Sequence, residues 1–208
     1  SVLDDIFTLQ DRFGLSNQFD GQKVQVEFVS ANPTSSLHVG HGRGAAFGMS
    51  VANLLEAIGY DVTREYYVND AGRQMDILAT STYLRYLQLN GEEITFPVNA
   101  YQGDYVSDIA QTLKTQHGDS YVHSFADVAK DVSEDAQFEI NADGEKTVIS
   151  GDKEAHIDGL IANSKSLLGD SYALFLNAAL SSILADIKDD LNDFGVSYEC
   201  WFSERAID

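Results

Sequence analysis

The spacing of hydrophobic residues changes twice within the first third of this chain. Residues 23–30 are rich in β-branched and aromatic side chains, which predicts a strand. Apolar residues then recur at spacings of three and four, which predicts a helix. These residues are Phe47, Val51, Leu54, Leu55 and Ile58. Gly59 is placed to end the helix in a left-handed cap, and residues 60–68 again favour a strand.

A strand, a helix and a strand in this order make a βαβ unit, whose strands should be parallel with a right-handed crossover. Ligands of such sheets bind beyond the carboxyl ends of the strands. Asn32, His38 and Asn69 fall at that edge. The pattern therefore predicts an α/β fold with a Rossmann-like parallel sheet and a site at the strand ends.

The rest of the chain is predicted to be mainly helical, with one β-hairpin and one further strand. Residues 1–22 are expected to form a lead-in segment, and 91–100 a loop. Asp143-Gly144 is suited to the turn of the hairpin. Helices are expected over residues 73–89, 105–113, 121–132, 153–168 and 172–194, the hairpin over 138–149 and the strand over 196–203.

Composition narrows the class of protein. No apolar run approaches the roughly 20 residues of a membrane span, so no membrane partner is expected. The N-terminal region has no basic segment followed by an apolar one, so no secretory signal is expected. Cys200 is the only cysteine, which excludes an intramolecular disulfide and favours a cytoplasmic location.

The chain is strongly acidic, with a formal net charge of −20. Nucleic-acid binding normally needs a basic surface, so this chain alone is not expected to bind nucleic acid well. Two interpretations remain open. The acidic surface aids solubility or reflects adaptation to salt or cold, or the basic nucleic-acid surface lies on other parts of a longer protein.

The most informative segment is His38-Val39-Gly40-His41, at the predicted helix start. A helix N-terminus attracts anions through its dipole and its free backbone N–H groups. Glycine lets a phosphate approach the backbone, and imidazoles can donate hydrogen bonds to phosphoryl oxygens. Two histidines three apart share one helix face. Neither a cysteine nor a further histidine lies near them, so a zinc site is poorly supported and no metal-ligating residue is assigned.

This segment resembles the HxGH signature of class I aminoacyl-tRNA synthetases and related nucleotidyltransferases. Its surroundings are similar to arginyl-tRNA synthetase of the bacterial type over about residues 20–90 and 155–206. The similar segments are 27–34 (Glu-Phe-Val-Ser-Ala-Asn-Pro-Thr), 42–46 (Gly-Arg-Gly-Ala-Ala), 61–72 (Asp-Val-Thr-Arg-Glu-Tyr-Tyr-Val-Asn-Asp-Ala-Gly) and 201–205 (Trp-Phe-Ser-Glu-Arg).

The resemblance implies the class I synthetase nucleotide-binding fold. The expected divisions are a lead-in segment (1–22), the first half of the catalytic domain (23–90), a mainly helical connective insertion containing the hairpin (91–152), and the return helices and strand (153–208). It also implies activation of L-arginine with ATP and transfer to tRNA(Arg) by a monomeric arginine–tRNA ligase. Mg²⁺ would accompany ATP.

The resemblance also assigns roles to residues. Ala31, Pro33, Thr34, Leu37 and Val39 complete the signature region around Asn32 and His38–His41. The expected ATP-binding residues are His38, Gly40, His41 and Gly42, of which His38 and His41 are catalytic. The expected arginine-binding residues are Glu27, Ser30, Asn32, His38 and Glu204.

Simpler roles stand beside these. Gly40 and Gly42 can serve helix-start flexibility alone, and Ser30 and Asn32 can form an Asx-type turn before Pro33. Glu27 lies in a strand expected to be buried, where a carboxylate needs a partner. That partner is a guanidinium ligand, or else a lysine or arginine of the protein. Helix capping is as good an assignment as substrate contact for residues 69 and 70.

The chain departs from the family in several ways. Ser35-Ser36 replaces the usual Gly-Pro, and the lysine-containing second signature loop and the anticodon-binding domain are absent. We therefore expect a fragment that is incomplete in activity. Two other hypotheses remain: a different HxGH nucleotidyltransferase, such as a cofactor adenylyltransferase, and a binding paralogue without catalysis.

Overall fold

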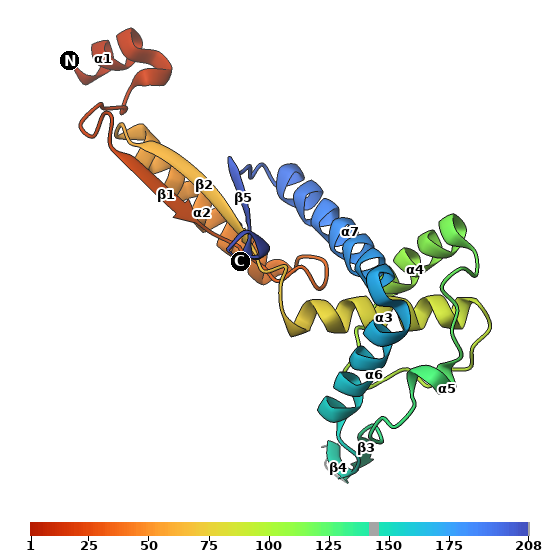
Figure 1. The fold of residues 1–208 in the computed structure, drawn as a ribbon. Helices are drawn as coiled ribbons and strands as arrows, with labels where there is room; N and C mark the ends of the chain where they lie inside the picture. Colours follow the sequence, from red (N-terminus) through yellow and green to blue (C-terminus); the bar gives the residue numbers. More distant parts are fainter. Residues whose placement is uncertain (142–145, 208) are drawn as a thin grey trace. The chain divides into compact units, whose positions relative to one another are not determined.

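The computed structural model describes residues 1–141 and 146–207, so the predicted Asp143-Gly144 turn lies outside the described residues (Figure 1). The chain forms two compact units. The sheet unit comprises Ser1–Asn32, Ser36–Asp70 and Asp186–Asp208, and the helical unit comprises Pro33–Ser35 and Ala71–Ala185.

A parallel three-stranded sheet forms the centre of the sheet unit. The strand order is β1 (Lys23–Glu27), β2 (Asp61–Val68) and β5 (Cys200–Ser203), and α2 (Val39–Ala57) connects the first two (Figure 1). The register pairs Glu27 with Glu65, and Glu65 with Cys200. The predicted βαβ unit and its parallel strands are confirmed.

Helix α2 packs through small residues rather than through the large apolar residues that predicted it. Ala45, Gly48 and Ala52 are buried, whereas Phe47 and Leu54 are 73% and 68% exposed. The small residues bring the helix backbone close to the sheet. A Cβ atom at position 48 would lie 2.2 Å from the Phe28 ring, so only glycine fits there.

We expect Gly48→Ala to destabilise the protein by about 1–3 kcal/mol, because the added methyl overpacks a filled contact. Gly44→Ala is the matched control in the same helix, since a Cβ there meets nothing within 4 Å. That change should stabilise by about 0.5–1 kcal/mol, as expected for replacing a helical glycine. Urea unfolding of both variants measures the difference, and equal stabilities would contradict the packing argument.

The helical unit contains α3 (Arg73–Leu89), α4 (Asp104–His117), α5 (Phe125–Val128), α6 (Lys153–Leu168) and α7 (Tyr172–Asp193) up to Ala185. The antiparallel hairpin is β3 (Gln137–Ile140) and β4 (Lys146–Ser150). In the core, Phe175 meets the rings of Tyr83 and Tyr86 edge to face. At the surface, Arg73 pairs with Glu154 and Asp158 of α6.

The run Lys153–Asp193 is long and apolar enough, by length and composition, to cross a membrane. Core helices of folded domains have the same properties. Ile157, Leu160 and Phe175 on this run have no exposed surface. These apolar residues pack within the protein.

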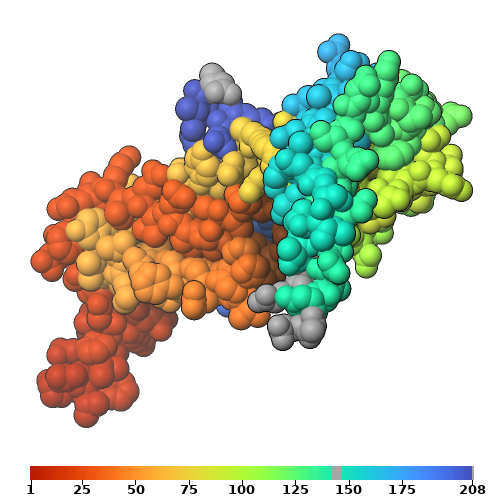
Figure 2. All heavy atoms as spheres, turned by 90° about the horizontal axis from the view of Figure 1, so that it is seen from below, coloured from red at the N-terminus to blue at the C-terminus, as the bar shows by residue number. Residues whose placement is uncertain are grey.

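The elements depart from prediction at several boundaries. Residues 2–9 of the lead-in segment form a helix, α1 (Val2–Leu9), which begins at a capping box between Ser1 and Asp4. Its apolar side chains are exposed, and it stands apart from the rest of its unit (Figure 2). The predicted helix over 121–132 is only the four residues of α5. The first strand ends at residue 27 rather than 30.

The last strand begins at Cys200 rather than at residue 196. The backbone N–H of Glu199 still donates to the Arg64 carbonyl, at 3.1 Å, but the Arg64 N–H is not paired with a backbone carbonyl of this strand. The Glu199 carboxylate accepts a hydrogen bond from the backbone N–H of Arg64 at 2.7 Å, which takes a ladder donor away from the strand. It also pairs with the Arg64 guanidinium, at 3.3 Å.

Candidate nucleotide and amino-acid site

His38 and His41 together cap the start of α2. His38 is the N-cap residue, and its Nδ1 accepts a hydrogen bond from the backbone N–H of Gly40 at 3.1 Å. Nδ1 of His41 accepts from the backbone N–H of His38 at 3.2 Å. The two rings stack, with centroids 3.7 Å apart. This is a capping box built from imidazoles in place of the usual hydroxyl and carboxylate.

These contacts determine where the ring protons lie. A ring nitrogen that accepts a hydrogen bond carries no proton, so each neutral imidazole carries its proton on Nε2. Because His38 is exposed and His41 is partly exposed, an incoming anion can reach that side of the rings. The arrangement offers two N–H donors beside the positive end of the helix dipole.

The pKa of His41 should lie below its ordinary value of 6.5, because of burial first and of repulsion from His38 second. We expect His38→Asn to raise this pKa only part of the way back, since burial remains. NMR titration of the imidazole Cε1–H measures it. A folded-state pKa below the unfolded one means that the stabilising contribution is full above pH 6.5 and declines as the pH falls below that value. A pKa at or above 6.5 would contradict this.

Glycines beside the histidines differ in what they allow. A Cβ atom at position 40 would lie 2.8 Å from Cε1 of His38, so Gly40 makes room for that ring. At position 42 a Cβ atom meets nothing within 4 Å, which leaves the backbone open to a ligand. A glycine is therefore needed at position 40 to accommodate the His38 ring. The absence of a side chain at Gly42 leaves the space that a ligand needs to approach the backbone.

The turn after β1 is held in an uncommon conformation. Val29 and Ser30 have φ values of 66° and 41°, which non-glycine residues rarely adopt. The Ser30 hydroxyl oxygen accepts from the backbone N–H of Tyr67 at 3.1 Å. The Tyr66 hydroxyl bonds both the N–H and the carbonyl of Ala31, and burial raises its pKa to about 12. Hydrogen bonds to two residues of β2 therefore hold the turn in its uncommon backbone conformation. A strained backbone held in this way is typical of a functional site.

Asn32 follows this turn and is exposed. Its side-chain oxygen accepts from Nδ2 of Asn69, at 3.1 Å, so the ends of β1 and β2 are linked by their amides. The juxtaposition predicted from strand topology for residues 32 and 69 is confirmed. The link uses the oxygen of the Asn32 amide and not its nitrogen.

Of the two roles left open for residues 69 and 70, capping of the following helix is wrong. The N-cap residue of α3 is Gly72, which lacks a side-chain cap. Asp70 is buried instead and accepts from the Ser203 hydroxyl at 2.7 Å and from the backbone N–H of Arg205 at 3.3 Å. Its role is to bind the end of β5 to the end of β2.

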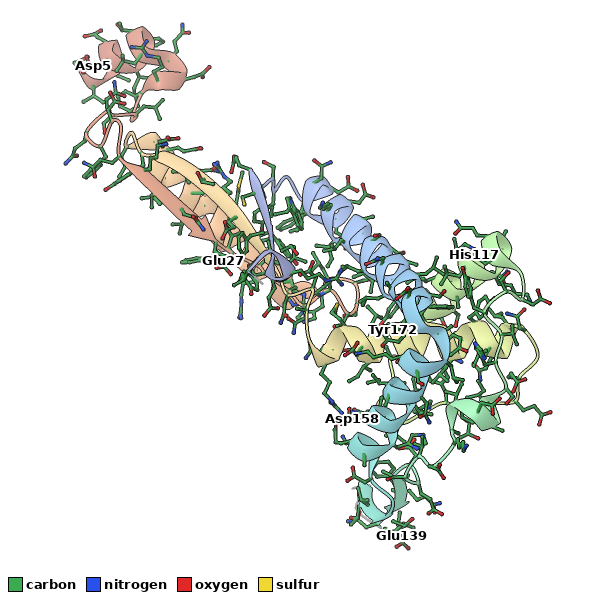
Figure 3. The ribbon with its side chains drawn as sticks, in the orientation of Figure 1. Asp5, Glu27, His117, Glu139, Asp158 and Tyr172 are labelled. Carbon is green, nitrogen blue, oxygen red and sulfur yellow. The ribbon has the colours of Figure 1, made fainter. Side chains whose placement is uncertain are left out.

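Glu27 is exposed at the end of β1, so the prediction of a buried carboxylate is wrong (Figure 3). The alternation of the strand places it on the face opposite to α2, together with Lys23 and Gln25. Val24 and Val26 are partly buried, because they face the helix. Within the described ranges, Glu27 forms no ion pair with a lysine or arginine.

A second carboxylate lies near the same strand ends. Burial raises the pKa of the Tyr67 hydroxyl, and so does its interaction with Glu204. Negative charge on Asp70 and Glu27 adds to the shift. Oε2 of Glu204 is buried and makes no hydrogen bond within the described part of the chain. The negative charge of Glu204, Asp70 and Glu27 therefore acts on the same part of the strand ends, which favours a cation there.

Sequence reasoning did not single out Tyr66 or Tyr67. The signal was present in principle, since both lie near the carboxyl end of β2, where ligands of parallel sheets bind. An aromatic residue on a strand is however far more often part of the core, and the residues that contact these hydroxyls lie far away in the sequence.

A parallel βαβ sheet with an imidazole pair at the start of its crossover helix is the arrangement expected of a class I synthetase fold. Residues 5–116 match the family described as tRNA synthetases class I (R), catalytic domain. The chain therefore belongs to the catalytic-domain family of arginyl-tRNA synthetases, and the predicted family and fold are confirmed.

Relatives of known sequence agree with this assignment, and a solved structure shares the fold. Arginine–tRNA ligase of Psychrobacter arcticus is 88% identical over 208 residues, and that of Acinetobacter baumannii is 64% identical over 209 residues. The chain is covered completely in both, but spans only 34% and 35% of their lengths. A crystal structure from Campylobacter jejuni described as an arginyl-tRNA synthetase shares the fold, with a TM-score of 0.64 and 24% identity over 98% of this chain and 35% of that chain.

Proposed function

We propose that this chain forms part of the catalytic domain of an arginine–tRNA ligase, which activates L-arginine with ATP and transfers it to tRNA(Arg). The observation that carries the proposal is the pair of imidazoles at the start of α2, whose Nδ1 atoms both accept backbone N–H groups. A relative 88% identical over the whole chain bears the name arginine–tRNA ligase and supports the choice of amino acid.

In the first step, a carboxylate oxygen of arginine attacks the α-phosphorus of ATP. The bond to the bridging oxygen breaks, and pyrophosphate leaves with the electron pair. His38 and His41 donate from Nε2 to phosphoryl oxygens as negative charge develops there. Gly42 leaves room for the nucleotide, and the dipole of α2 favours the anion.

Arginine is oriented at both of its ends. Ser30 and Asn32, with His38, contact the α-amino and carboxylate groups beside the phosphates. Glu27 and Glu204 receive the guanidinium, whose planar fork matches a carboxylate. Holding carboxylate and phosphorus in line supplies much of the rate enhancement, since no covalent enzyme intermediate is required.

Mg²⁺ fits this scheme as an ion carried by the ATP phosphates. Within the described residues, no group of three histidines, cysteines or carboxylates is arranged to hold a metal ion by itself. Transfer to tRNA requires a basic surface that this acidic chain does not provide, so we assign tRNA binding to other parts of the full-length protein. We expect that protein to act in the cytoplasm as a monomer.

The test is arginine-dependent exchange of pyrophosphate into ATP by the full-length protein, with tRNA(Arg) present. We expect exchange with arginine and none with lysine or citrulline at equal concentration. Exchange with another amino acid, or none with any, would reject the proposed function. Titration of the present chain with a non-hydrolysable arginyl-adenylate analogue then shows whether this portion alone carries recognition.

A further inference from the structure

The loop between the two halves of the site is held at its middle by a tyrosine from the insertion. The Tyr105 hydroxyl donates to the backbone carbonyl of Thr34 at 2.6 Å. Residues 33–35 belong to the same compact unit as α4, and Tyr105 lies in the first turn of that helix. The two residues are 71 positions apart in the sequence.

The contact matters because the loop joins two residues that are assigned to the site. Asn32 precedes the loop and is assigned to arginine, and His38 follows it and is assigned to ATP. The loop carries Ser35 and Ser36, which do not fix the backbone as proline would. Its conformation therefore depends on contacts. Pro33 is buried, and the Thr34 carbonyl is held by Tyr105.

Tyr105 is itself held in place. Its ring lies over Gly103, where a Cβ atom would come within 2.3 Å of the ring carbon Cε1. Burial, and then the nearby Tyr101, raise the pKa of the Tyr105 hydroxyl to about 12. The hydroxyl is therefore protonated near neutral pH and remains a hydrogen-bond donor.

We propose that Tyr105 is a positioning residue that orders the loop between Asn32 and His38, so that the arginine-binding and ATP-binding residues on either side are preorganised. The inference rests on the proposed function. Without the hydroxyl, the ligands themselves would have to order the loop, and the cost would reduce their binding.

The test is the steady-state kinetics of arginine activation by the full-length protein carrying Tyr105→Phe. We expect KM for ATP and KM for arginine each to rise about fivefold, which corresponds to one net hydrogen bond, with kcat changed less than about twofold. A merely structural defect would reduce the active fraction, and so lower kcat and leave both KM values unchanged.

Two further variants sharpen the test. Gly103→Ala keeps the hydroxyl but displaces the ring, and should raise the same two KM values. Tyr86→Phe is the matched control, because the Tyr86 hydroxyl also donates to a backbone carbonyl in this unit, that of Gly118 at 2.8 Å. It should leave both KM values unchanged.

The outcomes separate the two proposals. If the wild-type protein activates arginine and Tyr105→Phe has unchanged KM values, the positioning role is wrong and the proposed function stands. A rise that Tyr86→Phe reproduces would also overturn the positioning role, since it would reflect general loosening of the unit. A wild-type protein that does not activate arginine would reject both.

Discussion

Replacing His38 by asparagine, or His41 by glutamine, is expected to lower kcat for arginine activation about 10²- to 10³-fold, the cost of removing one donor to a developing oxyanion. Asparagine is a favourable N-cap residue and glutamine a favourable third residue of a capping box. In both variants the side-chain amide oxygen can accept the backbone hydrogen bond that Nδ1 of the imidazole accepts in the wild type. The N–H donor at the Nε2 position of the ring is lost. Pyrophosphate exchange by the full-length protein measures the effect.

The control for this prediction separates capping from catalysis. His38→Ala removes the cap together with the donor, so it should lower stability by about 1 kcal/mol relative to His38→Asn, with the same loss of kcat. Thermal unfolding and kinetics on the two variants make the comparison. Near-normal turnover in His38→Asn would show that His38 acts only as a cap.

Replacing Glu27 by glutamine is expected to raise KM for arginine about 10- to 100-fold, because a hydrogen bond between two charged groups is replaced by one to a neutral amide. KM for ATP should change little. The change should also narrow the discrimination between arginine and citrulline, since citrulline lacks the positive charge. Exchange kinetics with both amino acids measure it.

Glu65→Gln is the matched control for Glu27. Glu65 is the register partner of Glu27 on the neighbouring strand, but its carboxylate is already engaged by the Gln25 amide at 2.7 Å. The control removes one negative charge next to Glu27 without removing the proposed ligand. Equal effects of the two variants would show that local charge, and not a specific contact, determines arginine affinity.

Local patterns were sufficient to predict much of the fold. The helix over 73–89 was predicted with both boundaries, as was the helix over 153–168. The βαβ unit was predicted because periodicity, a terminating glycine and chain handedness act over short distances. Boundaries failed where a distant side chain competed for backbone groups, as Glu199 does at the start of β5.

The candidate site was predicted less completely than the fold. His38 and His41 could be assigned to a helix start because they are neighbours in the sequence. Glu27 was placed in a buried strand, but its exposure depends on which face of the sheet α2 covers. The hydrogen bonds that define the two imidazole tautomers also had no counterpart in any pattern of residue types.

The sequence by itself determined the order of the elements, the parallel sheet, the family and the place of the histidine pair at a helix start. Each of these is encoded by residues within one or two elements. Only the tertiary structure decided that Asp70 binds the end of β5, that Gly48 accommodates Phe28 and that Tyr105 holds Thr34. These contacts join segments separated by tens of residues. Their free energy depends on distance and burial in the folded chain, which local spacing does not encode.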